Sequence, residues 1–449
     1  MRRSFFNRHG HHGGMRSPLA IASRYLAQAR SFSRHNPVAI NYAIDGLLVL
    51  GATSFAANTN NLFALRLGAG EIHLAMLQFL PQVLNLFLLI PAGLFADSLR
   101  NKRRMLTGSL TMAAILFLAV GAVGFSSVQP LLLFLAFLAM ANGAIMLYST
   151  AWQGYFPEVV EPEKRNDVLT LRTRMSMLVS FFIPLLTGSV LSAIPSDRGK
   201  IIAHQIFYGM VAILLLCNVV HLRKITAIDP VPPKKFKFEE IKKAGARLVK
   251  NRPFIMFAGV ALLFHMTWHF DWTLYFIGQV NYLHMNELQL SLAVVGATAV
   301  QFTTLRFWSK RNLKHGVEKP VVFGIIGLAF HGLVMVIATA LPLSIGPIVF
   351  IILHSLATWT LSTISLNFFQ CLLPVLDKEY RSFSASVYTM LIALSNALMP
   401  LAGVAIYRGL GGGIDVIRTI YAFVFVLRIV AGGLWWLRVK VYLRQKREE

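Results

Sequence analysis

Residues 91–106 read Pro-Ala-Gly-Leu-Phe-Ala-Asp-Ser-Leu-Arg-Asn-Lys-Arg-Arg-Met-Leu. An apolar run ends near Gly93 and Asp97, four basic residues follow, and the sequence becomes apolar again at Met105. In membrane proteins, Lys and Arg accumulate in the short loops on the cytoplasmic side. The stretch therefore predicts a tight cytoplasmic loop between two membrane-spanning helices.

The composition of the whole chain agrees with this prediction. Hydrophobic residues make up 56% of the 449 positions and charged residues only 14%, which is too apolar for a soluble globular domain. A spanning helix needs about 20 mainly apolar residues. Windows of that length predict an all-α membrane protein with twelve transmembrane helices, at 37–60, 72–97, 105–125, 130–155, 168–193, 200–221, 253–280, 286–307, 320–340, 345–372, 382–407 and 415–437.

The basic residues give an independent prediction of topology. If both termini are cytoplasmic, 37 of the 43 Lys and Arg residues fall in cytoplasmic segments. We therefore expect an integral protein of the plasma membrane with both termini in the cytoplasm. The net charge of +24 is spread over these segments, which predicts anionic membrane lipids as partners and no nucleic acid.

The predicted helices divide into two equal halves. Residues 37–221 and 253–437 each contain six of them. The linker, 222–252, starts with a proline-rich stretch and continues as an amphipathic helix, which either lies on the membrane surface or is solvated. Residues 1–36 and 438–449 are predicted to be basic cytoplasmic tails, and an organellar targeting segment is the alternative for 1–36.

The predicted loop within residues 91–106 carries a family resemblance. Gly93, Asp97 and Lys102 match the pattern Gly-x-x-x-Asp-x-x-Gly-x-basic-basic, which resembles the loop between the second and third helices of the major facilitator superfamily. The sequence departs from that pattern at Ser98, Arg100 and Asn101.

This resemblance implies the superfamily's fold, in which two six-helix pseudo-repeats hold the substrate between them near the membrane midplane. It also implies a gating latch, in which the Asp bridges to the start of the eleventh helix near Tyr380. The alternative is a surface ion pair worth about 0–1 kcal/mol. The residues of the predicted latch are Gly93, Asp97, Lys102, Arg103 and Arg104.

Ionisable residues inside the membrane are costly and mark candidate functional sites. Asp45 in the first span either takes up and releases a proton or reaches the interface. His265 and His269 in the seventh span share a helical face, and Asp271 follows them. Three alternative roles remain for these residues: they relay protons, they contact the substrate, or they serve in helix packing. A metal is a further alternative, but the geometry is poor and a fourth ligand is missing, so we predict no metal site.

Arg428 is a cation near the middle of the last span, so it should meet an acid, backbone carbonyls or an anionic ligand. His331 and His354 are single, and we expect them to be packed and hydrogen-bonded. Polar side chains in membrane helices also serve as helix–helix contacts. The candidates to line a substrate cavity are Gln78, Gln82, Asn142, Gln153, Trp268, Trp272, Gln301, Trp359, Asn367 and Arg428.

The sequence contains no phosphate-binding loop, nucleophile elbow, HExxH or paired cysteine ligands, so we predict neither an enzyme nor a cofactor. The hypothesis that remains is a secondary transporter that moves a small organic solute by alternating access. We expect it to couple efflux to protons and to act as a monomer. The alternatives are proton-coupled uptake of a metabolite or weak anion, which Arg428 would suit, and a membrane scaffold or receptor that transports nothing.

Overall fold

The computed structural model describes residues 37–161, 165–225, 238–377 and 380–448, and within these ranges a few side chains, including that of Asp97, are not described. The described residues form helices joined by short turns. Eleven of their helical segments are long and apolar enough to cross a membrane, and Leu178–Ala193 is a shorter apolar segment. The predicted all-α membrane protein is therefore confirmed.

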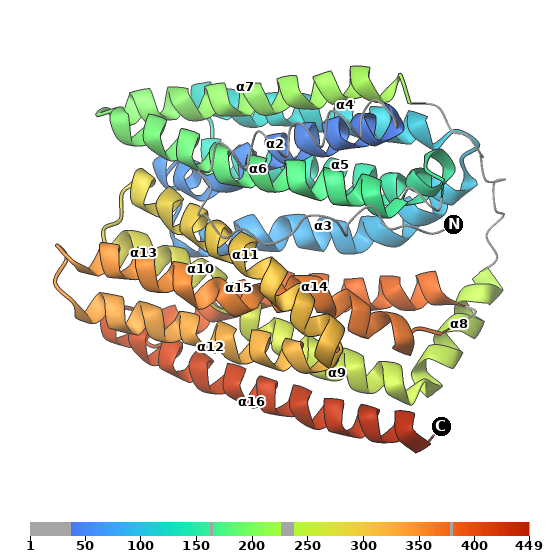
Figure 1. The fold of residues 1–449 in the computed structure, drawn as a ribbon. Coiled ribbons are helices and arrows are strands. Elements are labelled where there is room, and N and C mark those ends of the chain that lie inside the picture. Colours follow the sequence, from blue (N-terminus) through green and yellow to red (C-terminus); the bar gives the residue numbers. More distant parts are fainter. Residues whose placement is uncertain (1–36, 162–164, 226–237, 378–379, 449) are drawn as a thin grey trace, which may run out of the picture.

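The first half is a bundle of six helices, drawn in blue to green in Figure 1. Short connections make neighbouring helices antiparallel, and two of them start with recognisable signals. Pro130 stands in the first turn of α5, where its missing N–H costs nothing, and Ser196 caps α7 by accepting from the Gly199 N–H at 3.2 Å. The bundle comprises α2 (Pro37–Arg66), α3 (Glu71–Ser98), α4 (Lys102–Ala122), α5 (Pro130–Val159), α6 (Arg165–Ala193) and α7 (Asp197–Leu222).

The second half, in yellow to red in Figure 1, differs because two of its spans are interrupted. One span breaks at Phe270 and Asp271, between α9 and α10, and another breaks at the 3-10 turn Thr358–Thr360, between α13 and α14. Its helices are α9 (Arg252–His269), α10 (Trp272–Ile277), α11 (Glu287–His315), α12 (Glu318–Ala340), α13 (Gly346–Ala357), α14 (Leu361–Leu372), α15 (Arg381–Gly409) and α16 (Ile414–Glu448).

The last helix runs past the predicted boundary at residue 437, as far as Glu448. The physical reason is Arg438, whose buried guanidinium donates to both carboxylate oxygens of Glu318 at 2.6 and 3.3 Å. The guanidinium also lies over the ring of Phe257. In the first half a comparable buried ion pair joins Lys102, the first residue of α4, to Glu158 of α5.

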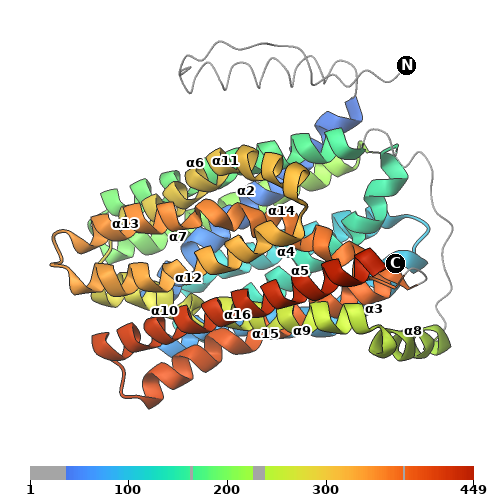
Figure 2. The same cartoon turned by 60° about the horizontal axis from the view of Figure 1, so that its bottom comes forward.

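The linker helix α8 (Phe238–Lys250) lies at the same end of the molecule as the C-terminus (Figures 1 and 2), which we call the linker end. Its Ala244 and Leu248 are buried, and it contacts α9 and α15. Arg247 pairs with Asp377 at 3.4 Å. These residues of the amphipathic helix thus pack against the second half, an arrangement that neither sequence alternative included.

The two halves meet along α3 and α15 and along α6 and α11. At the end opposite the linker, which we call the far end, Arg66 and Lys200 of the first half both pair with Glu287 of the second, the lysine at 2.7 Å. Gly188 allows this close approach, because a Cβ there would lie 2.9 Å from the Glu287 carbonyl oxygen. Charged side chains from both halves therefore hold the far end together.

Candidate functional site

The break between α9 and α10 organises the site. Arg428, on α16, donates from Nε and Nη2 to the Thr267 carbonyl oxygen at 3.3 and 3.1 Å. Its Nη2 also lies 3.4 Å from the carbonyl oxygen of Trp268. Interrupted helices inside a membrane are tolerated where other groups satisfy the backbone, and here Arg428 supplies the donors.

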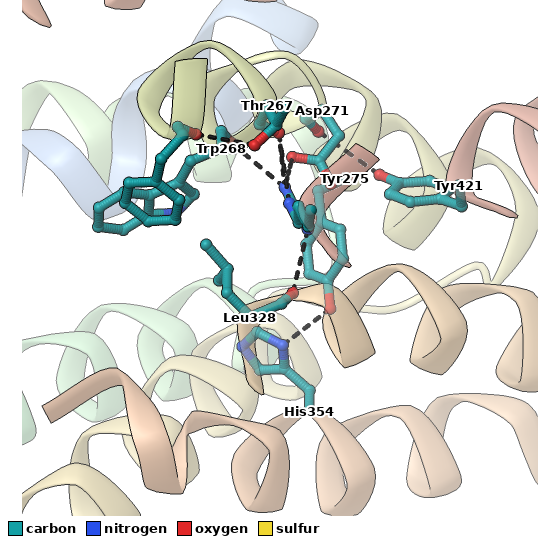
Figure 3. A network of polar contacts seen from close by, with 9 residues as sticks. Thr267, Trp268, Asp271, Tyr275, Leu328, His354 and Tyr421 are labelled. Carbon is teal, nitrogen blue, oxygen red and sulfur yellow. Dashed lines mark hydrogen bonds and ion pairs between the residues drawn. The ribbon is translucent and has the colours of Figure 1, made fainter. Parts of the chain in front are cut away.

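The same guanidinium forms an ion pair with Asp271, the residue at the break. Its Nη2 lies 2.6 Å from Oδ1, and both side chains are almost fully buried. Nη1 donates to the carbonyl oxygen of Leu328 on α12 at 3.2 Å. Arg428 thus ties the broken span to α12 and α16. Figure 3 labels two of its partners, Asp271 and Leu328. Removing one partner of such a buried pair costs about 3–5 kcal/mol.

A cavity of about 340 Å³ lies beside this ion pair and is lined by helices of the second half. Five predicted residues line it: Trp268, Asp271, Trp272, Gln301 and Arg428. Aromatic walls with a few well-placed polar groups are typical of small-molecule sites. The arrangement can therefore hold an organic solute through ring contacts and a small number of hydrogen bonds.

Nine further lining residues were not among the predicted site residues, and Tyr275, His331 and His354 are three of them. The Tyr275 hydroxyl lies 2.8 Å from Nδ1 of His354 (Figure 3), and the rings of His331 and His354 are 5.0 Å apart. Nε2 of His331 is buried and meets no hydrogen-bond partner among the described residues. Each of the three comes from a different helix, so no spacing in the sequence could have grouped them.

The histidines predicted for proton coupling lie outside the lining of this cavity. His269 Nδ1 lies 3.1 Å from the Ser395 hydroxyl of α15. His265 packs against Trp268 and Phe368, and neither of its buried ring nitrogens has a partner within the described part of the chain. Within the described ranges, no three His, Cys, Asp or Glu residues are grouped so that they could hold a metal.

Asp45, the other proton-coupling candidate, is fully buried in the first half. Its Oδ1 accepts from the Tyr148 hydroxyl at 2.6 Å and from the Asn218 amide at 2.8 Å. Its Oδ2 accepts from the Trp152 indole at 3.1 Å and lies 3.7 Å from the Arg172 guanidinium. Four side chains from three other helices therefore surround this one carboxylate.

The other cavity candidates are placed elsewhere. Asn142 donates to the Leu138 carbonyl of its own helix at 2.8 Å, and the Trp359 carbonyl accepts from the Trp308 indole at 2.7 Å. The amide of Asn367 exchanges two hydrogen bonds with that of Asn312, at 2.6 and 3.0 Å. Gln78 and Gln82 are partly buried on α3 and Gln153 is exposed on α5.

The predicted latch residues lie at the linker end. Lys102 is engaged by Glu158, and Arg103 donates to the Arg223 and Ile225 carbonyls, both at 3.1 Å. Arg104 is exposed. A Cβ at Gly93 would be in ordinary contact with Thr150, at 3.9 Å. Because the Asp97 side chain lies outside the described residues, the latch stays a prediction.

Comparison with known proteins decides the family. The sequence profile of the Major Facilitator Superfamily matches residues 42–374, well over half of the chain. The chain belongs to the major facilitator superfamily. A search of curated proteins found no match for this superfamily member.

Solved structures agree with the superfamily fold. A bacterial homologue of the iron transporter ferroportin in the inward-facing state is 13% identical, with a TM-score of 0.66 over 88% of this chain and 98% of the other. A bacterial homologue of the lysosomal transporter Spinster, also inward-facing, is 13% identical, with a TM-score of 0.62 over 91% of this chain and 97% of the other. The POT family transporter PepTSo is 13% identical, with a TM-score of 0.66 over 91% of this chain and 99% of the other. At this identity the matches show the fold alone.

Membership of the major facilitator superfamily establishes the general activity. The chain is a secondary transporter embedded in a membrane through multiple helical spans, and it is not an enzyme. Members of the superfamily bind small-molecule substrates. The predicted superfamily and its fold are thus confirmed.

Proposed function

We propose that this transporter binds a small, largely apolar organic solute in the cavity of the second half and expels it in exchange for protons. The observation that carries the proposal is the cavity beside the Asp271–Arg428 pair, with Trp268 and Trp272 among its lining residues. We place the transporter in the plasma membrane as a monomer, with both termini in the cytoplasm.

The charge balance of the cavity favours a solute without net charge. Arg428 brings a positive charge to the lining, but Asp271 neutralises it at 2.6 Å, and carbonyl oxygens accept from Nε, Nη1 and Nη2 of the guanidinium. A bound anion would have to compete with these partners for the guanidinium. A neutral solute instead meets aromatic rings and the imidazole of His331, whose Nε2 has no protein partner in the described part of the chain.

The same ion pair supports the proposal of proton coupling. A proton on Asp271 would remove the charge that holds Arg428 and would loosen the break between α9 and α10. Asp45, surrounded in the first half by neutral donors and Arg172, is the second candidate. Alternating access further requires that Arg66 and Lys200 release Glu287 at the far end in each cycle.

The alternative is uptake of a weak anion together with protons. Arg428 favours this alternative only if a protonated Asp271 releases the guanidinium to a bound anion. The two functions differ in the direction of the solute: an imposed proton gradient drives efflux in one case and accumulation in the other. Transport measurements on the purified protein therefore separate them.

The test uses proteoliposomes with a pH-sensitive dye in the lumen and a panel of neutral aromatic compounds and weak organic acids. We expect neutral compounds to elicit proton movement opposite to solute movement and to quench tryptophan fluorescence. Asp271→Asn should abolish the coupled proton movement. The matched control is Asp415→Asn, since Asp415 also pairs with an arginine, at 3.2 Å, but its side chain is 89% exposed.

Three outcomes would overturn parts of the proposal. Proton movement that survives in Asp271→Asn would exclude this carboxylate from coupling. Exclusive transport of the organic acids would favour the uptake alternative. Absence of flux for the whole panel, in protein that unfolds cooperatively on heating, would leave a scaffold or receptor.

A further inference from the structure

An open groove of about 620 Å³ lies on the outer face of α4 near the linker end. Arg104, Gly108, Thr111 and Ile115 line it at intervals of three or four residues, so they share one face of the helix. The opposite face of α4, which includes Leu110, is buried in the bundle. In a membrane-spanning helix, the face with the groove is therefore turned outward, toward lipid.

The floor of the groove is apolar despite its two threonines. The Thr107 hydroxyl donates to the Arg103 carbonyl at 3.0 Å, and the Thr111 hydroxyl donates to the Thr107 carbonyl at 2.9 Å. With their donors occupied inside the helix, these side chains contribute mainly methyl groups. A Cβ at Gly108 would meet nothing within 4 Å, and the Ile115 side chain is 61% exposed. The groove therefore suits a hydrocarbon chain.

Two arginines, Arg104 and Arg223, are among the residues that line the groove. The turn that contains Arg223 is held firmly against the neighbouring helices. Arg103 donates to the carbonyls of Arg223 and Ile225, and the Tyr155 hydroxyl donates to the Ile225 carbonyl at 3.0 Å. Guanidinium groups bind phosphate oxygens in planar, bidentate geometry, so these two arginines suit a phosphate.

We infer that the groove binds one anionic phospholipid, with its phosphate between Arg104 and Arg223 and an acyl chain along Gly108 to Ile115. A soluble phosphate would use the two arginines but not the apolar floor. Each basic residue near an anionic lipid surface strengthens attraction roughly fivefold, so the pair should favour an anionic over a zwitterionic lipid roughly thirtyfold. The site lies away from the solute cavity and does not depend on the cargo.

The experiment is native mass spectrometry of the full-length protein, released from micelles with equal amounts of phosphatidylglycerol and phosphatidylcholine. We expect the wild type to retain one phosphatidylglycerol preferentially. Arg104→Gln with Arg223→Gln should lower this preference roughly thirtyfold. The matched control is Arg100→Gln with Lys224→Gln, which removes two exposed charges near the same end outside the groove lining, and it should retain the preference.

A second variant tests the apolar part of the site without changing charge. Gly108→Leu has room for its Cβ and should fill the groove, so the bound lipid should be lost while both arginines remain. Glycerol phosphate, which has the headgroup chemistry but no acyl chains, should not displace the lipid from the wild type. Equal losses in the two double variants, full retention in Gly108→Leu, or displacement by glycerol phosphate would each overturn the inference.

Discussion

Among the side chains that the structure describes, each half of the transporter buries one aspartate, and the two carboxylates are held differently. Asp45 lies on α2, an unbroken helix of 30 residues, and accepts hydrogen bonds from Tyr148, Trp152 and Asn218. Asp271 lies at a break in its span, and Arg428 both pairs with it and donates to nearby carbonyls. The carboxylate in the first half is thus shared among several donors, whereas the one in the second half depends on one cation.

The difference indicates which half is built to change. Loss of one neutral donor leaves Asp45 with the others, so the carboxylate stays stabilised when a single hydrogen bond is removed. Loss of the single ion pair around Asp271 exposes a charge, a helix break and the wall of a cavity together. We therefore expect the second half to respond to a proton or a solute and the first half to act as the more rigid partner.

Asp271→Asn should have the largest effect, because it leaves the Arg428 charge buried without its acid. We expect a destabilisation of about 3–5 kcal/mol, measured as a lower thermal-unfolding midpoint in detergent by tryptophan fluorescence. The control Asp415→Asn, in an exposed pair, should cost about 0–1 kcal/mol. Equal shifts in the two variants would contradict the central position of Arg428.

Tyr148→Phe tests how the first half holds the carboxylate of Asp45. It removes a 2.6 Å hydrogen bond to Asp45, and a bond to a charged group is worth about 1.5–3 kcal/mol. The decrease in the free energy of unfolding should be smaller than in Asp271→Asn, because Asp45 keeps its other donors. Tyr388→Phe is the control, since the buried Tyr388 hydroxyl meets no partner among the described residues and its removal should leave the unfolding midpoint nearly unchanged.

Glu287→Gln should have the smallest effect, and it tests whether the halves move apart as units. It removes the acid that Arg66 and Lys200 share at the far end. We expect about 1 kcal/mol, roughly a fivefold rise in the population open at the far end, because the Gln carbonyl oxygen can still accept a hydrogen bond from Arg66 or Lys200. Spin-label distances across that end measure this population. Glu71→Gln is the control, because Glu71 and Arg408 are 4.0 Å apart and more exposed. Unchanged distances in Glu287→Gln would show that other contacts close this end.

Much of the fold could be predicted from the sequence because a membrane requires apolar spans and favours basic cytoplasmic loops. The breaks within the spans of the second half could not be predicted. Pro81, Pro91 and Pro184 lie inside continuous helices, whereas the break at Phe270 and Asp271 contains neither proline nor glycine. Tertiary contacts from Arg428 compensate this break, and those contacts come from a helix more than 150 residues away in the chain.

The same reason limits what could be predicted of the candidate site. Asp45, Asp271 and Arg428 stood out because a charge inside a membrane span needs a partner. His331 and His354 did not, because a single imidazole in an apolar helix is compatible with packing. Only the assembled bundle brings these two rings together, 5.0 Å apart. The end of α16 was missed because Arg438 resembles the start of a charged tail until Glu318 is placed beside it.

The two buried ion pairs at the starts of α4 and α12 have opposite polarity. Lys102 begins α4 and pairs with an acid, whereas Glu318 begins the corresponding helix of the other half and pairs with Arg438. A helix inserted into the wrong half during synthesis would bring a lysine into the bundle that buries Arg438, or a glutamate into the bundle that buries Glu158, in surroundings where like charges are costly. The reversed polarity thus distinguishes correct from exchanged assembly of two bundles that share one architecture.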